Sequence, residues 1–156
     1  MRQNFSNRQI TPTLFDRLTD REPRVKTDLP ATSWEQLKDF KEAVARDLSN
    51  LLNVRRSELD IPEEFEETNR SIAAYGMLDF SASPVDSDQM RRAMEQCIRK
   101  FEPRLSRVVV HLSETVPLRL EFRISAYLQI DVRSEPVLYD ASLPMHSRRF
   151  QVTEGR

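Results

Sequence analysis

One stretch of the chain, residues 118–132, alternates between apolar and other side chains without a break. Such alternation is typical of a half-buried β-strand, in which successive side chains point to opposite faces of a sheet. One face would carry Leu118, Leu120, Phe122, Ile124, Ala126, Leu128, Ile130 and Val132. The other would carry Arg119, Glu121, Arg123, Ser125, Tyr127, Gln129, Asp131 and Arg133. Any fold of this chain must therefore include a sheet with one face on a core.

The length of this strand bears on binding. Fifteen residues at roughly 3.3 Å each would span about 50 Å, whereas ordinary strands have roughly 3–10 residues. Either the strand bends and pairs with different neighbours along its length, or part of it projects beyond its own sheet. A projecting strand would offer unpaired backbone groups to another chain. The sequence leaves both arrangements open.

Two amphipathic helices and a second strand complete the predicted core. Apolar residues recur at steps of three and four over residues 34–52 and again from about 86 to 101, as on one face of a helix. Residues 106–112 are rich in β-branched side chains, and the link 113–117 predicts a hairpin with the long strand. We therefore predict an α+β fold, with two main amphipathic helices packed on a small antiparallel sheet that contains a long hairpin.

The pattern divides the chain into three segments. Residues 1–30 are polar and interrupted by prolines, residues 31–135 form a single α+β domain, and residues 136–156 form a C-terminal extension with room for one further strand over 148–153. The first segment contains a short predicted helix, at about residues 12–19, whose apolar side consists of Leu14, Phe15 and Leu18. A helix this short is not stable alone, so it must dock on its own domain or on another subunit.

The composition argues against several classes of function. The 24 basic and 25 acidic residues leave a formal net charge of −1, which gives no general electrostatic reason to bind nucleic acid or a membrane surface. Only two glycines occur, Gly76 and Gly155, and they form neither a GxGxxG dinucleotide loop nor a phosphate-binding P-loop. Two histidines and one cysteine cannot form an ordinary zinc site without several carboxylates. We expect no cofactor, no metal and no nucleic acid partner.

The chain reads as a cytoplasmic protein. No apolar run approaches the roughly 20 residues that span a bilayer, so we expect no direct membrane insertion. The single cysteine, Cys97, cannot form an internal disulfide, which fits a reducing compartment. Cys97 falls on the apolar stripe of the second helix, and this position predicts a buried small residue rather than a reactive thiol.

Three residues directly after the second helix, Glu102, Pro103 and Arg104, form the most distinctive polar feature. Proline ends the helix and disfavours helical angles at the residue before it, so we expect an extended segment with Glu102 and Arg104 on the same side. A glutamate at a helix C-terminus opposes the helix dipole, which favours a specific partner. The alternative is an incidental surface ion pair.

Several segments, in this order, resemble the TssE family, the baseplate subunits of type VI secretion systems. They are residues 13–20 near the start, residues 51–56 after the first helix, residues 71–79, and residues 101–105 with the Glu-Pro-Arg sequence. Within the third segment we predict a short helical turn over residues 71–75, which Gly76 can end in the left-handed conformation. The resemblance covers about residues 12–135. It implies kinship with the sheath-initiating baseplate proteins of contractile-tailed phages and a domain similar to the strand-exchanging part of sheath proteins.

The resemblance also implies partners. TssE proteins join the wedge proteins TssF and TssG, start polymerisation of the TssB–TssC sheath, and lie beside the Hcp tube and near TssK, at the inner face of the inner membrane of a Gram-negative bacterium. By this resemblance, Glu102, Pro103 and Arg104 would contact the wedge core. The 118–133 strand and its hairpin, with Arg119, Glu121, Arg123, Tyr127, Gln129 and Asp131, would form the template to which sheath strands add.

The alternative function is a lysozyme-like peptidoglycan hydrolase, because the family has carried that label. Glycoside hydrolysis normally needs two carboxylates across a cleft, one of them protonated as the general acid. Glu102 is the distinctive candidate acid, and the arginine two residues away would stabilise its charged form instead. No second carboxylate stands out in the sequence. We therefore predict a structural protein and no enzyme.

Overall fold

The structure is a computed structural model that describes residue 18 and residues 33–56, 61–62, 64–80, 86–116, 118–130 and 133–155. The chain divides into two compact units, Met1–Val44 and Ala45–Arg156. The described part of the first unit is residue 18 and the beginning of helix α2. The second unit holds the sheet and the remaining helices.

Two long helices form where the apolar periodicity predicted them. Helix α2 spans Ser33–Asn53 and helix α4 spans Ser87–Phe101. In α4 the carboxylate of Asp86 accepts hydrogen bonds from the backbone N–H groups of Asp88 and Gln89, which satisfies donors that the first turn cannot bond internally. The buried side chains of the two helices within the second unit are Ala45, Leu48, Leu51 and Leu52 of α2 and Met90, Met94, Cys97 and Ile98 of α4.

Between these helices the chain forms short helix α3 (Glu66–Arg70) and the 3-10 turn η1 (Ile72–Ala74). The turn matches the predicted one, and Gly76 follows it with a φ of +103°. A β-carbon at Gly76 would lie 2.4 Å from the carbonyl oxygen of Val54. Both facts require glycine at this position. Other residue types disfavour a positive φ, and the Val54 carbonyl leaves no space for a β-carbon.

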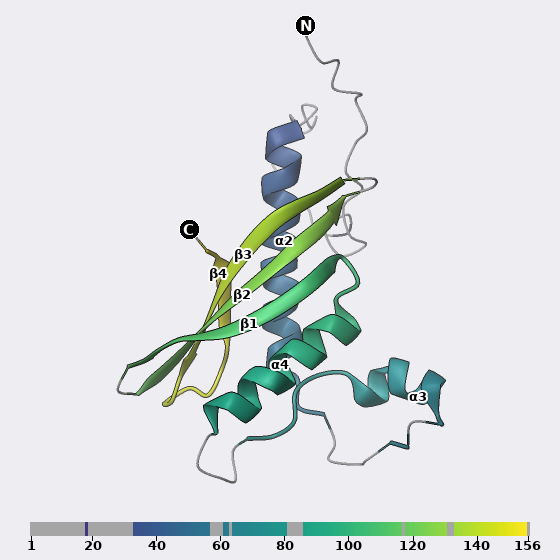
Figure 1. Cartoon of the computed structure of the whole chain (residues 1–156), viewed down its shortest axis with the longest axis vertical. Helices are drawn as coiled ribbons and strands as arrows, with labels where there is room; N and C mark the ends of the chain where they lie inside the picture. Colours follow the sequence, from purple (N-terminus) through teal and green to yellow (C-terminus); the bar gives the residue numbers. More distant parts are fainter. Residues whose placement is uncertain are drawn as a thin grey trace, which may run out of the picture. The chain divides into compact units, whose positions relative to one another are not determined.

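The sheet has four antiparallel strands in the order β1-β2-β3-β4 (Figure 1). Their bounds are Leu105–Val116, Arg119–Ile130, Arg133–Pro144 and Gln151–Glu154. β1 and β2 form the predicted hairpin, with one-residue register shifts after Ser106 and after Leu112 that mark β-bulges. The fold class is α+β, as predicted from the sequence.

The alternation of β2 sorts the side chains almost as predicted. Leu120, Phe122, Ile124, Ala126 and Leu128 are buried, and they meet Val108 and Val110 of β1 and Val137, Tyr139, Ala141 and Leu143 of β3 in one core. Leu118 was assigned to the same buried face, and this is wrong. It lies in the turn before β2, with a φ of +71° and 78% of its surface exposed, because reversing the chain turns the side chain away from the sheet.

The segment after residue 135 differs from the predicted extension with one strand. Its first part continues β3, which pairs with all of β2 from Ile130↔Arg133 to Arg119↔Pro144. Pro136 lies within β3, and β4 pairs with β3 only over Tyr139–Ser142. Pro136 thus lies where β3 has β2 as its single described strand neighbour, and an unpaired strand edge tolerates proline. The weak final strand predicted over 148–153 exists as β4, shifted toward the C-terminus.

Candidate functional site

The turn from α4 into β1 contains the Glu102, Pro103 and Arg104 motif. The N–H of Glu102 donates to the carbonyl of Ile98, and the N–H of Leu105 donates back to the carbonyl of Glu102. This closes a four-residue turn, so the predicted extended segment is wrong. The prediction that Glu102 and Arg104 lie on the same side is confirmed, because the arginine Nε donates to Glu102 Oε1 at 2.7 Å and its Nη2 donates to Oε2.

A third residue, Asp47 of α2, completes this cluster. Arg104 Nη2 also donates to Asp47 Oδ2 at 2.8 Å, which joins α2 to the start of β1. Glu102 is only 5% exposed. Burial by itself lowers the pKa of the Arg104 guanidinium, but its bonds to Glu102 and Asp47 outweigh burial and raise that pKa above its ordinary value. The guanidinium therefore stays charged and fixed between two carboxylates.

This geometry explains the glutamate at the C-terminal end of α4. Its partner is an arginine of the same chain, and Glu102 is buried while Arg104 is partly buried, so this is no incidental surface ion pair. Only Pro103 is fully at the surface, while the side chain of Arg104 is 21% exposed. The sequence predicted the pair of Glu102 and Arg104 but not the contact with Asp47. Asp47 lies 57 residues before Arg104, and no nearby sequence pattern connects the two residues.

The outer face of the sheet carries the other predicted site residues. Arg119, Arg123, Tyr127 and Gln129 are exposed and Glu121 is half-buried, while Asp131 lies outside the described residues. Arg119 pairs with Glu121 at 2.9 Å, and Arg123 Nε pairs with Asp140 Oδ1 of β3 at 3.0 Å. Gln129 donates to Ser106 Oγ, and the Arg107 guanidinium lies 5.5 Å from the centre of the Tyr127 ring.

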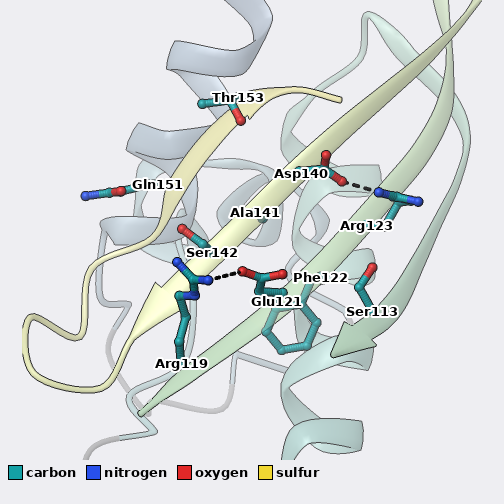
Figure 2. Close-up of a pocket in the computed structure, with 10 residues that line it drawn as sticks. All are labelled: Ser113, Arg119, Glu121, Phe122, Arg123, Asp140, Ala141, Ser142, Gln151 and Thr153. Atoms are coloured by element: carbon teal, nitrogen blue, oxygen red, sulfur yellow. Dashed lines mark hydrogen bonds and ion pairs between the residues drawn. The ribbon is translucent and has the colours of Figure 1, made fainter. Parts of the chain in front are cut away.

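The two ion pairs line a shallow hollow of about 600 Å³ across the outer face, which Figure 2 shows. Its polar walls come from β1, β2, β3 and β4, namely Ser113, Arg119, Glu121, Arg123, Asp140, Ser142, Gln151 and Thr153. Each carboxylate in it faces an arginine, so the hollow presents balanced charge. Glu102 does not line this hollow, and so the candidate acid of the hydrolase alternative does not face it.

The position of β2 in the sheet bears on strand addition. β2 pairs with β3 along its whole length and with β1 over Arg119–Leu128. It does not bend to new neighbours, so that predicted arrangement is wrong, and its described residues do not project beyond the sheet; residues 131–132 of the predicted strand lie outside the described residues. Over Arg119–Leu128 a further strand cannot pair with β2 unless β1 or β3 leaves it. Among the described strands, the sheet ends at β1 and at β4, and these are the edges that a new strand can reach.

The remaining predicted residues have varied positions. Leu18 of the N-terminal docking set is 77% exposed, and Leu14 and Phe15 lie outside the described residues. Cys97 is buried as predicted, and its thiol donates to the carbonyl of Gly76 at 3.3 Å. Within the described part of the chain, no group of three or more His, Cys, Asp and Glu side chains could hold a metal ion. No helix described there has the length and apolar character to cross a membrane.

A comparison with known protein families matches residues 38–132 to the family described as baseplate wedge protein gp25. The match runs from α2 through the Glu102 turn to the end of β2. The chain belongs to the baseplate wedge protein gp25 family. This membership makes it a component of a phage-tail-like baseplate, and it agrees with the resemblance to TssE proteins, the type VI secretion members of this family. No curated protein and no solved structure shows a significant match.

Proposed function

We propose that this protein is the gp25-family subunit of a type VI secretion baseplate, a structural protein that joins the TssF–TssG wedge and starts the TssB–TssC sheath. The family match over residues 38–132 carries the proposal, and the TssE-like segments narrow it to type VI systems. In this role it would act in the cytoplasm at the inner membrane, beside Hcp and TssK, with no cofactor and no enzymatic activity.

The Glu102 turn is the proposed wedge contact, with roles divided among its residues. Glu102 is buried and bonded to Arg104, so it positions the arginine rather than touching the wedge itself. Pro103 is exposed at the tip of the turn, and part of Arg104 reaches the surface beside it. The rigid cluster with Asp47 holds this small surface in one conformation, which lowers the entropic cost of binding.

The sheath contact is proposed for the sheet. A strand added to an edge gains backbone hydrogen bonds along its length, and the charged outer face, with Arg119, Glu121 and Arg123, would fix the orientation of the partner through charge complementarity. Tyr127 and Gln129 extend the same surface toward the other end of β2, and Asp131, which lies outside the described residues, belongs to the same proposed set. The exposed edge strands take over the template role first assigned to β2.

Co-purification tests the two contacts separately. Tagged full-length protein is combined with TssF–TssG and, in a second experiment, with TssB–TssC. Pro103→Asp places a charge at the exposed tip, and we expect it to abolish wedge binding while sheath subunits still bind. Arg123→Ala, on the outer face, is the matched control and should bind the wedge like the wild type. Wedge binding by Pro103→Asp at wild-type strength would rule out the turn as the contact, and failure of the wild type to bind either complex would overturn the proposed function.

A further inference from the structure

The outer edge of β1 is covered along part of its length by side chains of α4, which runs alongside it (Figure 1). We call Arg91, Glu95 and Arg99 the α4 charge row. Glu95 Oε2 accepts a hydrogen bond from the N–H of Val110 at 3.1 Å, and Arg91 Nη1 donates to the carbonyl of the same residue at 3.4 Å. Arg99 donates to the carbonyl of Val108 from Nη2 at 2.7 Å and from Nε at 3.1 Å.

The α4 charge row is held in place by its own ion pairs. Arg99 Nη2 lies 2.7 Å from Glu95 Oε1, and Arg91 Nη1 lies 3.7 Å from Glu95 Oε2. Residues four apart on a helix are separated by about 6 Å along its axis, close to the roughly 6.6 Å between alternate residues of a strand. Charges at this helical spacing can therefore follow the outward backbone groups of a neighbouring strand.

The coverage ends at Val110. The backbone groups of an antiparallel strand point to alternate sides, so Leu112 points its N–H and C=O outward, as Val108 and Val110 do. One turn before Arg91 the helix begins with Ser87, whose short side chain cannot extend the row. No hydrogen bond from the described residues reaches the outward groups of Leu112, and its side chain is 36% exposed although it follows the buried Val110.

We infer that a partner strand adds to β1 only from Leu112 onward, and that the α4 charge row sets this limit. The inference rests on the proposed sheath-initiating function and specifies where the strand pairs. An extended polypeptide suits this edge for two reasons. Another strand can hydrogen-bond to the backbone N–H and C=O groups, which are spaced as in a strand, and its side chains can cover the exposed Leu112 side chain. At Val108 and Val110 a partner would have to displace charge-assisted bonds that are already made.

Amide hydrogen exchange of the full-length protein, alone and bound to TssB–TssC, tests the limit. In the wild type we expect the amide of Leu112 to slow by about tenfold or more on binding, with no change at Val110, which is already bonded to Glu95. Leu112→Pro removes the outward N–H while leaving the bonds to β2, so it should lose sheath binding and keep TssF–TssG binding. Leu112→Ala keeps the N–H and is the matched control, which should bind both.

Two further outcomes separate this inference from the function on which it rests. Sheath binding by Leu112→Pro, with slowed amides in β4, would overturn the β1 limit and leave sheath initiation standing. An absence of slowed amides at both edges of the wild type would refute sheath initiation by strand addition. Glu95→Ala should let protection extend to Val110, whereas Glu95→Gln retains an acceptor and should behave like the wild type. Unchanged protection in Glu95→Ala would show that the α4 charge row sets no limit.

Discussion

The helix-covered side of the sheet and its outer face each carry arginine–carboxylate pairs, and the two sides differ in burial. On the covered side Arg104 is bonded to Glu102, which is 5% exposed, and to Asp47. On the outer face the side chains of Arg123 and Asp140 are 48% and 43% exposed. Water screens the outer pair, whereas the inner cluster must satisfy its charges internally. The same residue types thus fix the fold on one side and remain available to partners on the other.

The largest expected effect comes from breaking the inner cluster. Arg104→Met leaves the carboxylates of Glu102 and Asp47 without the cation they share, and we expect the free energy of unfolding in urea to fall by about 3–5 kcal/mol. Glu102→Ala removes the bonds between Glu102 and Arg104 but leaves the arginine paired with Asp47, so it should cost less, about 1.5–3 kcal/mol. A Glu102→Ala variant within about 1 kcal/mol of the wild type would contradict the difference between the two sides.

A smaller loss is expected at Gly76, where the backbone rather than a charge is constrained. Gly76→Ala forces a β-carbon against the Val54 carbonyl at a positive φ, which should cost about 1–3 kcal/mol in urea unfolding. Gly155→Ala is the control, because the nearest atoms to its β-carbon belong to the Leu138 side chain, at 3.1 Å, which can shift. Equal losses in the two variants would show that Gly76 is not specially constrained.

The buried thiol makes the covered side sensitive to alkaline pH. Burial raises the pKa of Cys97 to about 11 from an ordinary value of 9.0, although the nearby cations Arg56 and Lys100 oppose this. The folded protein therefore favours the neutral thiol, and its stabilising effect is complete below pH 9 and is lost as the pH rises toward 11. We expect the wild type to lose stability relative to Cys97→Ala by roughly 1 kcal/mol per pH unit in that window. If the free energies of unfolding of the wild type and of Cys97→Ala change in parallel between about pH 9 and 11, this prediction is wrong.

The smallest effect is expected on the outer face. Arg123→Ala breaks the exposed pair with Asp140 and should change the free energy of unfolding by less than about 1 kcal/mol, with the difference shrinking further in high salt. Arg119→Ala should behave alike, since its partner Glu121 is also partly exposed. A loss of unfolding free energy comparable to that of Glu102→Ala would mean that the outer pairs stabilise the fold. The outer face would then not be free to use these side chains for binding a partner.

Local patterns in the sequence predicted much of the fold. The steps of three and four in α2 and α4, the alternation of β2, and Gly76 after a short turn each depend on neighbours within a few residues. These predictions were confirmed because helix and strand periodicity place nearby side chains on one face whatever the rest of the chain does. The motif of Glu102 and Arg104 was visible for the same reason, since its two side chains are two residues apart.

What the tertiary structure alone decided concerns contacts between distant segments. The sequence did not indicate that β3 would pair along the whole of β2, or that Asp47 would join Glu102 and Arg104 in one bonded cluster. Nor did it indicate that Arg91, Glu95 and Arg99, which resemble an ordinary solvated helix face, would bond the edge of β1. Periodicity specifies which face of an element is apolar, but the neighbour on that face is chosen by packing of the whole chain. The sequence by itself therefore determined the two long helices, the β1–β2 hairpin and the family, and the tertiary structure determined the place of β3 and which polar groups remain open to partners.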